Sequence, residues 1–389
     1  METKTMNELI LFTSEFPPQP GGIGNHSYNL AVQLAENQFK VQVLTDSRSR
    51  DGQQEAEHDN RLGFSVIRVP VRKPRLIMYL NRLFLVFGLV FIKRKENLVL
   101  IASGKFPLWG LAFLSLFFRK PRYIAIIHGS EVNFPRGLNR FLTTHSLKRF
   151  HKIVGVSNYT LSLVKHFLQK EQLVFIPNGF EPGRLVHNEV GNLRGNPRLI
   201  TVGGVTRRKG QQNVIKAMPE ILKSHPDAHY HIVGIPTAKK EFEALASQKG
   251  VLDHITFHGA VSDEMLGKLL GNSHVFCMLS ETQSSGDTEG FGIAIIEGNA
   301  LGLPAIGSAG CGIEDAIKQG CSGILVDSQN AMDVVEAVNT ILTDYKRYSE
   351  NAVAWSEKHT WKEIVKKYVN VIVDELNRDS ESKKSTFRR

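Results

Sequence analysis

Short apolar segments alternate with helix-like segments along almost the whole chain. Near its start, the apolar segment ELILFTSEF is followed by SYNLAVQLAEN, which has leucine and alanine at helical spacing, and then by the apolar segment KVQVLT. Ten more apolar segments follow, at residues 97–103, 122–130, 152–158, 172–180, 198–204, 228–234, 254–260, 274–280, 303–308 and 322–327. Apolar runs that alternate with helices are typical of parallel strands covered on both faces. The sequence therefore predicts an α/β fold with doubly wound parallel sheets.

The length of the chain predicts two domains. A single hydrophobic core stops growing at about 250–300 residues, and this chain has 389 residues, of which 42% are apolar. The best boundary is residues 176–198, which are rich in Pro, Gly and Asn and follow the last apolar segment of the first half. We therefore expect an N-terminal domain at 1–180, a C-terminal domain at 190–357, a cleft between them, and a polar tail at 378–389.

Cysteine usage and the N-terminus indicate a cytoplasmic protein. Cys277, Cys311 and Cys321 match no metal-binding or redox spacing, so we expect free thiols in a reducing compartment. The apolar run near the N-terminus is too short for a signal peptide or a membrane span. We interpret it as the first strand.

Positive charge is concentrated in the first half of the chain. Residues 1–180 hold 24 Lys or Arg and 12 Asp or Glu, whereas residues 181–389 hold 24 and 26. Within the first half, residues 64–95 contain eight basic residues and no acid, around a long apolar run. Such a surface favours anions, whether phospholipid, polyprenyl phosphate or nucleic acid.

Residues 76–92 form the apolar part of this basic segment. Asn81 and Arg82 interrupt the run, so that it is too short to span a bilayer. Two interpretations remain, a buried core helix and an interfacial helix on an anionic membrane. The second rests on the flanking basic residues, which are Arg68, Arg72, Lys73, Arg75, Lys93, Arg94 and Lys95.

Two loops of the first half follow predicted strands and carry candidate binding groups. Glycines 21, 22 and 24 in PQPGGIGNH would let backbone N–H groups approach an anion at a helix start, although a simple tight turn or a degenerate dinucleotide loop fits as well. His128 comes directly after the apolar strand RYIAII and before a glycine. A structural and a functional role are about equally expected for this histidine.

In the second half, the loop in TVGGVTRRKGQQNVI brings Arg207, Arg208 and Lys209 to a helix start. A cluster of solvated charges is the simpler interpretation. However, a helix N-terminus already carries partial positive charge, which disfavours cations there unless an anion lies between them. A phosphate is the simplest such anion.

Two glutamates, Glu289 and Glu297, stand eight positions apart in EGFGIAIIEGNALG. IAIIEGNAL is a predicted helix, with Glu297 two turns in. An unpaired carboxylate in such an apolar helix would cost several kcal/mol, so Glu297 should have a hydroxyl or a cation as partner. A ribose would supply two hydroxyls.

Together these motifs resemble the retaining glycosyltransferases of family 4, which have the GT-B architecture of two Rossmann-like domains facing a cleft. The resemblance is carried by EGFGIAIIE, VGGVTRRKG, GGIGNH, IIHGSEV, IPNGF and AGCGIED, and it extends from about Leu9 to about Leu376. It implies an acceptor-binding N-terminal domain and a donor-binding C-terminal domain. It also implies that residues 358–377 form a closing helix that crosses back to the N-terminal domain.

The resemblance implies a role for each candidate residue. His128, Lys209 and Glu289 would be catalytic: His128 bonds the donor sugar, Lys209 binds the diphosphate, and Glu289 contacts the sugar beside the reacting centre. Glu297 would bind the ribose. The other expected donor-binding residues are Gly22, Gly204, Arg207, Arg208, Gly290, Phe291 and Gly292, some through their backbone N–H groups.

One position departs from the family pattern. Many members have an arginine where this chain has Gly204, so we expect Arg207 or Arg208 to supply the second phosphate cation. No Asp-x-Asp pair follows a strand, and the basic loop supplies the charge that a divalent metal would bring. We therefore expect no metal site and no cofactor, with a UDP- or GDP-sugar as donor substrate.

The expected function is metal-independent, retaining transfer of a hexose or N-acetylhexosamine from a nucleotide-diphosphate sugar to a glycan, lipid-linked or other hydroxyl acceptor. The expected location is cytoplasmic, with residues 64–95 a candidate contact to the inner face of a membrane, and nucleic acid is not an expected partner. An alternative is a noncatalytic nucleotide-sugar-binding subunit of a glycan-assembly complex. A nicotinamide-dependent oxidoreductase is disfavoured by the incomplete glycine fingerprint.

Overall fold

The computed structural model describes residues 7–19, 21–49, 51–71, 75–93, 97–133, 137–186 and 193–386. Its side chains are described for these residues except 75, 76 and 379–386. The chain divides into two compact units. Unit 1 comprises the described residues of 1–156, 160–176 and 361–389, and unit 2 those of 157–159 and 177–360.

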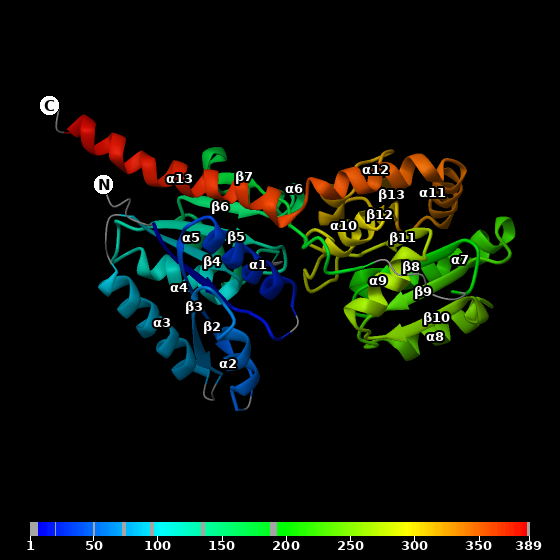
Figure 1. Cartoon of the computed structure of the whole chain (residues 1–389), viewed down its shortest axis with the longest axis horizontal. Helices are drawn as coiled ribbons and strands as arrows, with labels where there is room; N and C mark the ends of the chain where they lie inside the picture. The colour runs from blue at the N-terminus through cyan, green and yellow to red at the C-terminus, as the bar shows by residue number, and fades with distance from the viewer. Residues whose placement is uncertain are drawn as a thin grey trace. The chain divides into compact units, whose positions relative to one another are not determined.

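Unit 1 is built on a parallel sheet of seven strands in the order β3-β2-β1-β4-β5-β6-β7 (Figure 1). Its strands are β1 (Glu8–Thr13), β2 (Lys40–Ser47), β3 (Ser65–Pro70), β4 (Leu98–Ser103), β5 (Arg122–Ile127), β6 (Lys152–Gly155) and β7 (Leu173–Phe175). Its helices are α1 (Gly22–Glu36), α2 (Gln53–Asp59), α3 (Arg75–Ile92), α4 (Lys105–Leu114), α5 (Leu138–Leu147) and α13 (Trp361–Thr386), with α6 (Asn158–Ser162) at the boundary between the units and a 3-10 turn at Lys170–Gln172.

Unit 2 is built on a parallel sheet of six strands in the order β10-β9-β8-β11-β12-β13. Its strands are β8 (Arg198–Val202), β9 (His229–Val233), β10 (Ile255–Gly259), β11 (Val275–Met278), β12 (Ala305–Ser308) and β13 (Gly323–Val326). Its helices are α7 (Gln211–Ser224), α8 (Lys239–Gln248), α9 (Asp263–Gly271), α10 (Ile293–Ala300), α11 (Ala331–Thr343) and α12 (Tyr345–Glu357), with 3-10 turns at Arg207–Lys209, Leu252–His254 and Gly312–Ala316.

The burial of the strands explains why they read as continuous apolar runs. All six residues of β4 are buried, and so are all five of β9. A strand buried at every position has helices packed on both faces of its sheet. The predicted α/β class with two Rossmann-like parallel-sheet domains is therefore confirmed.

Helix α13 belongs to unit 1 although it comes last in the chain. It packs against α1, where the Tyr368 hydroxyl lies 3.0 Å from His26 Nε2 and the Trp361 ring lies against the His26 ring (Figure 1). Trp361 and Tyr368 are each 1% exposed. Burying two large aromatic side chains fixes this helix on unit 1.

The apolar run at 76–92 forms α3, which has two unlike faces. Met78, Val86 and Val90 are buried in the core of unit 1. The outer face leaves large apolar side chains at least 38% exposed, namely Ile77, Leu80, Phe84, Leu85, Phe87, Phe91 and Ile92. In the part of the chain that the structure describes, no helix combines the length and apolarity needed to cross a membrane.

The basic side chains that the structure describes in residues 64–95 are paired with acids. Arg68 pairs with Asp59, Arg82 with Asp46, and Lys93 with Glu8. These acids come from other parts of unit 1, so the absence of acids within residues 64–95 gave a misleading picture of the local charge. Arg72, Lys73, Arg94 and Lys95 lie outside the described residues, and the Arg75 side chain is not described.

Candidate active site

Unit 2 gathers several predicted site residues at the carboxyl ends of β8 and β11. The 3-10 turn Arg207–Lys209 follows β8, and the loop to α10 follows β11. This is the edge of an open parallel sheet where ligands bind. The basic residues precede α7, which begins at Gln211, so they lie on a turn before the helix and not in its first turn.

Glu289 lies between Arg208 and Lys209. Its Oε2 atom is 2.5 Å from Arg208 Nη1 and 2.6 Å from Lys209 Nζ, and Arg208 also pairs with Asp287 at 3.3 Å. Burial alone would raise the pKa of Glu289, but Lys209 and Arg208 hold that pKa below its usual value. The phosphate expected between these cations stays a prediction, and the anion that the structure places beside them is the Glu289 carboxylate.

Glycine 210 makes this cluster sterically feasible. It has φ +78°, and a Cβ on it would lie 1.8 Å from the carbonyl oxygen of Leu279, at the end of β11. The turn therefore approaches the β11 loop more closely than any other residue would allow. A hydrogen bond from Glu281 N to Arg208 O, 3.1 Å long, joins the same two loops.

Arg207 and Arg208 differ in their surroundings. Arg208 is part of the Glu289 cluster, whereas Arg207 turns away to Glu241 on α8, at 2.5 Å, and its side chain is 66% exposed. At Gly204 a Cβ would meet nothing within 4 Å, so the space of the usual arginine is open. Of the two residues predicted to supply the second phosphate cation, Arg208 is therefore the better placed.

Glu297 has a cationic partner, as the sequence required, and this partner is Arg184. Glu297 Oε1 lies 2.6 Å from Arg184 Nη2, and the same guanidinium pairs with Asp263 at 2.6 Å. Burial raises the pKa of Glu297, although Arg184 opposes the shift. Helix α10 begins at Ile293, so Glu297 is one turn in, and the prediction of two turns was wrong.

A cavity of about 240 Å³ adjoins Glu297. Arg184, Glu181 and Leu301 contribute to its lining. Arg184 comes from the connecting segment after β7, and sequence reasoning did not single it out. Only its place in the Pro- and Gly-rich boundary next to the second half of the chain could have drawn attention to it.

The residues between the two glutamates offer backbone groups. Phe291 is 1% exposed, with its ring against His359, so its side chain belongs to the core of unit 2. Gly292 has φ +86° and precedes the first turn of α10. A Cβ on Gly312 would lie 2.1 Å from the carbonyl oxygen of Gly290, which shows how closely these two loops pack.

His128 lies in unit 1 at the carboxyl end of β5. Its Nε2 atom is 2.9 Å from Ser103 Oγ, and its backbone N–H donates to Glu131 Oε1. Burial lowers the pKa of His128 to about 4 and raises the pKa of Glu131 to about 7. His128 is therefore neutral at pH 7, and it can donate or accept a hydrogen bond without carrying charge.

Three residues around His128 were missed by the sequence analysis, namely Ser103, Glu131 and His26. The His26 and His128 rings lie 5.0 Å apart, and burial lowers the pKa of His26 as well. Glu131 stands three positions after His128 in IIHGSEV, and this spacing is the only signal that could have revealed it. At Gly22, the first residue of α1, a Cβ would meet nothing within 4 Å, so the backbone there is open to a ligand.

The predicted site residues thus form one set in each unit. Gly22 and His128 belong to unit 1, whereas Gly204, Arg207, Arg208, Lys209, Gly290, Phe291, Gly292, Glu289 and Glu297 belong to unit 2. Among the described residues, no group of three or more His, Cys, Asp or Glu side chains could hold a metal ion.

Two parallel-sheet units, with a basic turn and a paired glutamate loop at one sheet edge, have the GT-B architecture. Two family models match consecutive parts of the chain: Glycosyltransferase Family 4 at residues 20–184 and Glycosyl transferases group 1 at residues 186–359. The chain belongs to glycosyltransferase family 4.

Similar proteins agree with this assignment. A GDP-mannose-dependent alpha-(1-6)-phosphatidylinositol monomannoside mannosyltransferase of Mycobacterium tuberculosis is 26% identical over 363 residues, 88% of this chain and 91% of that protein. Its counterpart from Mycolicibacterium smegmatis is 25% identical over 364 residues, with 89% and 92% covered.

Solved structures share the fold. Anabaena HepE in complex with UDP and glucose has a TM-score of 0.74 at 16% identity, covering 94% of this chain and 99% of that one. A glycosyltransferase from Rickettsia africae also has a TM-score of 0.74, at 17% identity, covering 95% and 98%.

Proposed function

We propose that this glycosyltransferase transfers a hexose from a nucleoside-diphosphate sugar to a lipid-linked acceptor, with retention of configuration and without a metal ion. The observation that carries the proposal is the Arg208–Lys209–Glu289 cluster at the carboxyl ends of β8 and β11. Two cations held by a buried carboxylate form a preorganised site for a diphosphate leaving group. A divalent metal would duplicate their charge.

GDP-mannose is the first donor to test, because the mycobacterial relatives are named GDP-mannose-dependent mannosyltransferases. UDP-glucose is the second, because the Anabaena structure holds UDP and glucose. The Glu297 carboxylate would accept hydrogen bonds from the ribose hydroxyls, and Arg184 would have to share or release it. Lys209 and Arg208 would bind the diphosphate.

The chemistry follows from these charges. As the bond between the sugar and the phosphate breaks, Lys209 and Arg208 offset the charge that develops on the leaving diphosphate. A phosphate oxygen takes the proton of the acceptor hydroxyl on the same face of the sugar. Glu289 stabilises the reacting centre, and neutral His128 hydrogen-bonds a sugar hydroxyl. Neither glutamate forms a covalent intermediate, in contrast to retaining glycosidases.

The noncatalytic subunit remains the second candidate. It would share the fold and the nucleotide site but would neither transfer nor hydrolyse the sugar. The Glu289 carboxylate beside Lys209 and Arg208 favours the enzyme, because a carboxylate repels a diphosphate and so would not help a protein that only binds the nucleotide.

A thermal-shift panel of GDP, UDP and ADP tests the donor site. At about one hundred times its dissociation constant, the correct nucleotide stabilises the protein by about 2.7 kcal/mol. The panel is followed by turnover of the matching mannose or glucose donor in the presence of EDTA. Stabilisation with neither transfer nor hydrolysis would favour the noncatalytic subunit, and stabilisation by none of the three would contradict a nucleotide-sugar site.

Helix α3 supports a further part of the proposal, which is reversible docking on a membrane. Phe84 and Ile92 are 72% and 77% exposed on its outer face, an arrangement typical of interfacial helices. The relatives named above act on a phosphatidylinositol mannoside, which is a membrane lipid. The exposed apolar side chains support docking more than the charges do, because the described basic residues Arg68, Arg82 and Lys93 are ion-paired.

Vesicle co-sedimentation tests the docking. The native protein should bind vesicles of neutral and anionic phospholipid, and F84S/I92S should lose most of that binding. A Met332→Ser variant serves as the control, because Met332 is a similarly exposed apolar residue (58%) on α11 of unit 2. Equal binding by F84S/I92S and the control would contradict a role for α3.

A further inference from the structure

A large pocket of unit 1 lies among the described residues. It has a volume of about 1100 Å³ and opens at the carboxyl ends of β1, β2 and β3, against α3 and the start of α4. The sheet edge is where open α/β sheets bind their ligands. The predicted site residues do not line this pocket, and its own lining residues have no assigned role.

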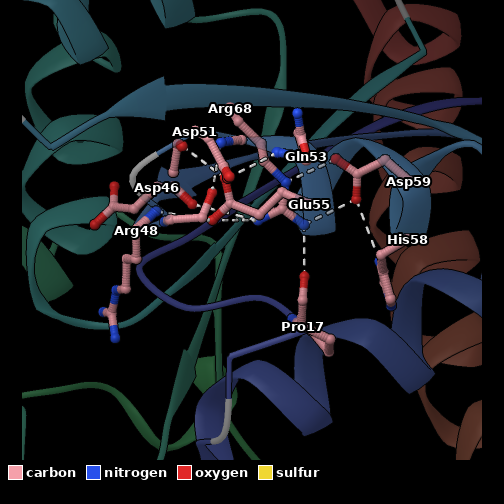
Figure 2. Close-up of polar contacts among 12 residues, drawn as sticks. Pro17, Asp46, Arg48, Asp51, Gln53, Glu55, His58, Asp59 and Arg68 are labelled. Carbon is pink, nitrogen blue, oxygen red and sulfur yellow. Dashed lines mark hydrogen bonds and ion pairs between the residues drawn. The ribbon is translucent and has the colours of Figure 1, made fainter.

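The loop that forms the pocket floor is held in place by a buried carboxylate, Glu55 of α2. Glu55 accepts hydrogen bonds from Ser47 Oγ (2.6 Å), Arg48 N (2.8 Å) and Ser49 N (3.2 Å), as Figure 2 shows in part. These hydrogen bonds hold the pKa of Glu55 below its usual value although burial opposes the shift. The last residue of β2 and the two residues after it are thus fixed before any ligand arrives.

A second carboxylate of α2, Asp59, is bound by Arg68 of β3. Arg68 makes two hydrogen bonds to Asp59, at 2.7 and 2.8 Å, and a further one to the carbonyl oxygen of Pro17 (Figure 2). Its guanidinium also lies 3.5 Å from Glu55. A pocket wall anchored by such a network is preorganised, which lowers the entropic cost of binding.

Arg82 and Asp46 form a buried ion pair in the pocket wall. Arg82 Nη2 lies 2.5 Å from Asp46 Oδ1, and Arg82 is 4% exposed. Burial raises the pKa of Asp46 and lowers the pKa of Arg82, so removing the two charges from water costs free energy. Among the described residues, Arg82 Nε has no hydrogen-bond partner. The pair therefore has hydrogen-bonding capacity that the protein does not use.

The wall beside this ion pair is aromatic. Tyr79 and Phe106 stack with ring centroids 4.6 Å apart, and Arg82 lies over both rings. Trp109 completes this wall, with Lys105 4.9 Å from its ring and its Nε1–H donating to Thr143. Flat aromatic faces beside hydroxyl, carboxylate and guanidinium groups suit the C–H faces and the hydroxyl rim of a polyol ring.

The charges of the lining favour a neutral ligand over a phosphate. Arg48, Arg82 and Lys105 line the pocket together with Asp46 and Asp51, and Glu15 lies 3.8 Å from Arg48, so the basic groups are balanced by as many acidic ones. An anion site needs cations that exceed the nearby acids. A sugar or cyclitol hydroxyl both donates and accepts, so it can bond carboxylates and guanidinium groups at once.

We propose that this pocket binds the sugar or cyclitol ring of the acceptor, held by Asp46, Arg48 and Arg82 and packed on Tyr79 and Trp109. Helix α3 supplies two of these residues and also carries the exposed apolar face, so an apolar tail on the same molecule would lie along α3. The acceptor is therefore an amphiphile with a neutral polyol head. That the bound molecule is the acceptor of the reaction rests on the proposed function.

Saturation-transfer NMR tests the pocket with three probes: methyl α-mannopyranoside, octyl α-mannopyranoside below its micelle concentration, and inorganic phosphate. Both mannosides should bind, the octyl compound more tightly, and phosphate should displace neither. D46N and W109L should each weaken both mannosides by about tenfold, the loss expected for one bond to a charged group or one ring contact. F84S should weaken only the octyl compound, and Met332→Ser should weaken neither.

Failure of the mannosides to bind, displacement by phosphate, or equal affinity in W109L would overturn the inference. W109L keeps the test decisive if D46N proves unstable, because Trp109 is only part-buried and Asp46 belongs to the buried pair. Nucleotide-induced thermal shifts, measured on the same samples, report unit 2 separately. Mannoside binding without sugar transfer would contradict the proposed function but support the ligand of the pocket. Sugar transfer without mannoside binding would support the proposed function but contradict the ligand of the pocket.

Discussion

Among single residues, Lys209 offers the most direct test of the diphosphate site. Lys209→Ala removes one of the two cations beside Glu289 and leaves that buried carboxylate with Arg208 alone. We expect a loss of about 2 to 4 kcal/mol in transition-state stabilisation, measured as kcat/KM for the donor. Lys216→Ala is the matched control, because Lys216 is an exposed lysine of α7. Near-native turnover by K209A would sink the assigned role.

Glu289 and Glu297 should differ in what their loss impairs. Glu297→Ala is expected to weaken binding of the nucleoside diphosphate, because Glu297 is the proposed ribose ligand. Glu289→Ala is expected chiefly to lower turnover, because Glu289 is proposed to act at the sugar. Calorimetry with GDP or UDP, alongside turnover of both variants, separates the two. Equal loss of diphosphate affinity in both variants would refute this division.

Glu131 should make the stability of unit 1 depend on pH. Its pKa is raised from 4.5 to about 7, mainly by burial, so ionisation is less favourable in the folded protein than in the unfolded one. The stabilisation is complete below pH 4.5 and is lost as the pH rises through 7, by about 3 kcal/mol. Glu131→Gln should remove this dependence.

The measurement for Glu131 is the unfolding midpoint of unit 1 at pH 5 and pH 8, for the native protein and E131Q. We expect the native protein to lose more stability than the variant over this range. Parallel pH profiles would show that Glu131 does not titrate as its burial indicates.

Sequence reasoning found the residues of the site that stand in local motifs and missed those that reach it from elsewhere. Arg208, Lys209 and Glu289 were predicted, and the structure brings them together. Arg184 was missed, since its contact with Glu297 joins positions 113 residues apart. No local pattern encodes such a contact. Whether each predicted residue acts as proposed stays a prediction.

At the level of elements, the turn before α7 can be tested through its glycine. Gly210→Ala would force a Cβ against the carbonyl of Leu279, in addition to the strain of a positive φ. Gly250→Ala is the matched control, because Gly250 has φ +68° and open space around its Cβ position. We expect the control to lose about 1 kcal/mol from φ alone and G210A to lose more.

Unfolding midpoints and GDP or UDP affinity measure both glycine variants. G210A should also weaken diphosphate binding, since the displaced turn carries Arg208 and Lys209. Comparable stability and affinity in the two variants would show that the close approach to β11 is not needed.

The predicted strands agree with the structure because most of them are buried on both faces and read as uninterrupted apolar runs. Strand β3 was missed, since it contains Arg68 and ends at Pro70, with only Val69 buried. Such a sheet-edge strand lacks both the apolar run and a clean alternation. For residues 76–92 the sequence left two interpretations open. The inner face of α3 is core and its outer face is exposed and apolar, and contact of that outer face with a membrane stays a prediction.

For the whole molecule, the central claim is that two Rossmann-like units of a family 4 glycosyltransferase carry out retaining transfer with the Arg208–Lys209–Glu289 cluster. The measurement that tests it most directly is proton NMR of the product formed from GDP-mannose or UDP-glucose, both α-linked donors, with EDTA present and octyl α-mannopyranoside as acceptor. The account predicts an α-linked product from one donor and its loss in K209A. A β-linked product, or a product that forms only when a divalent metal is restored, would contradict it.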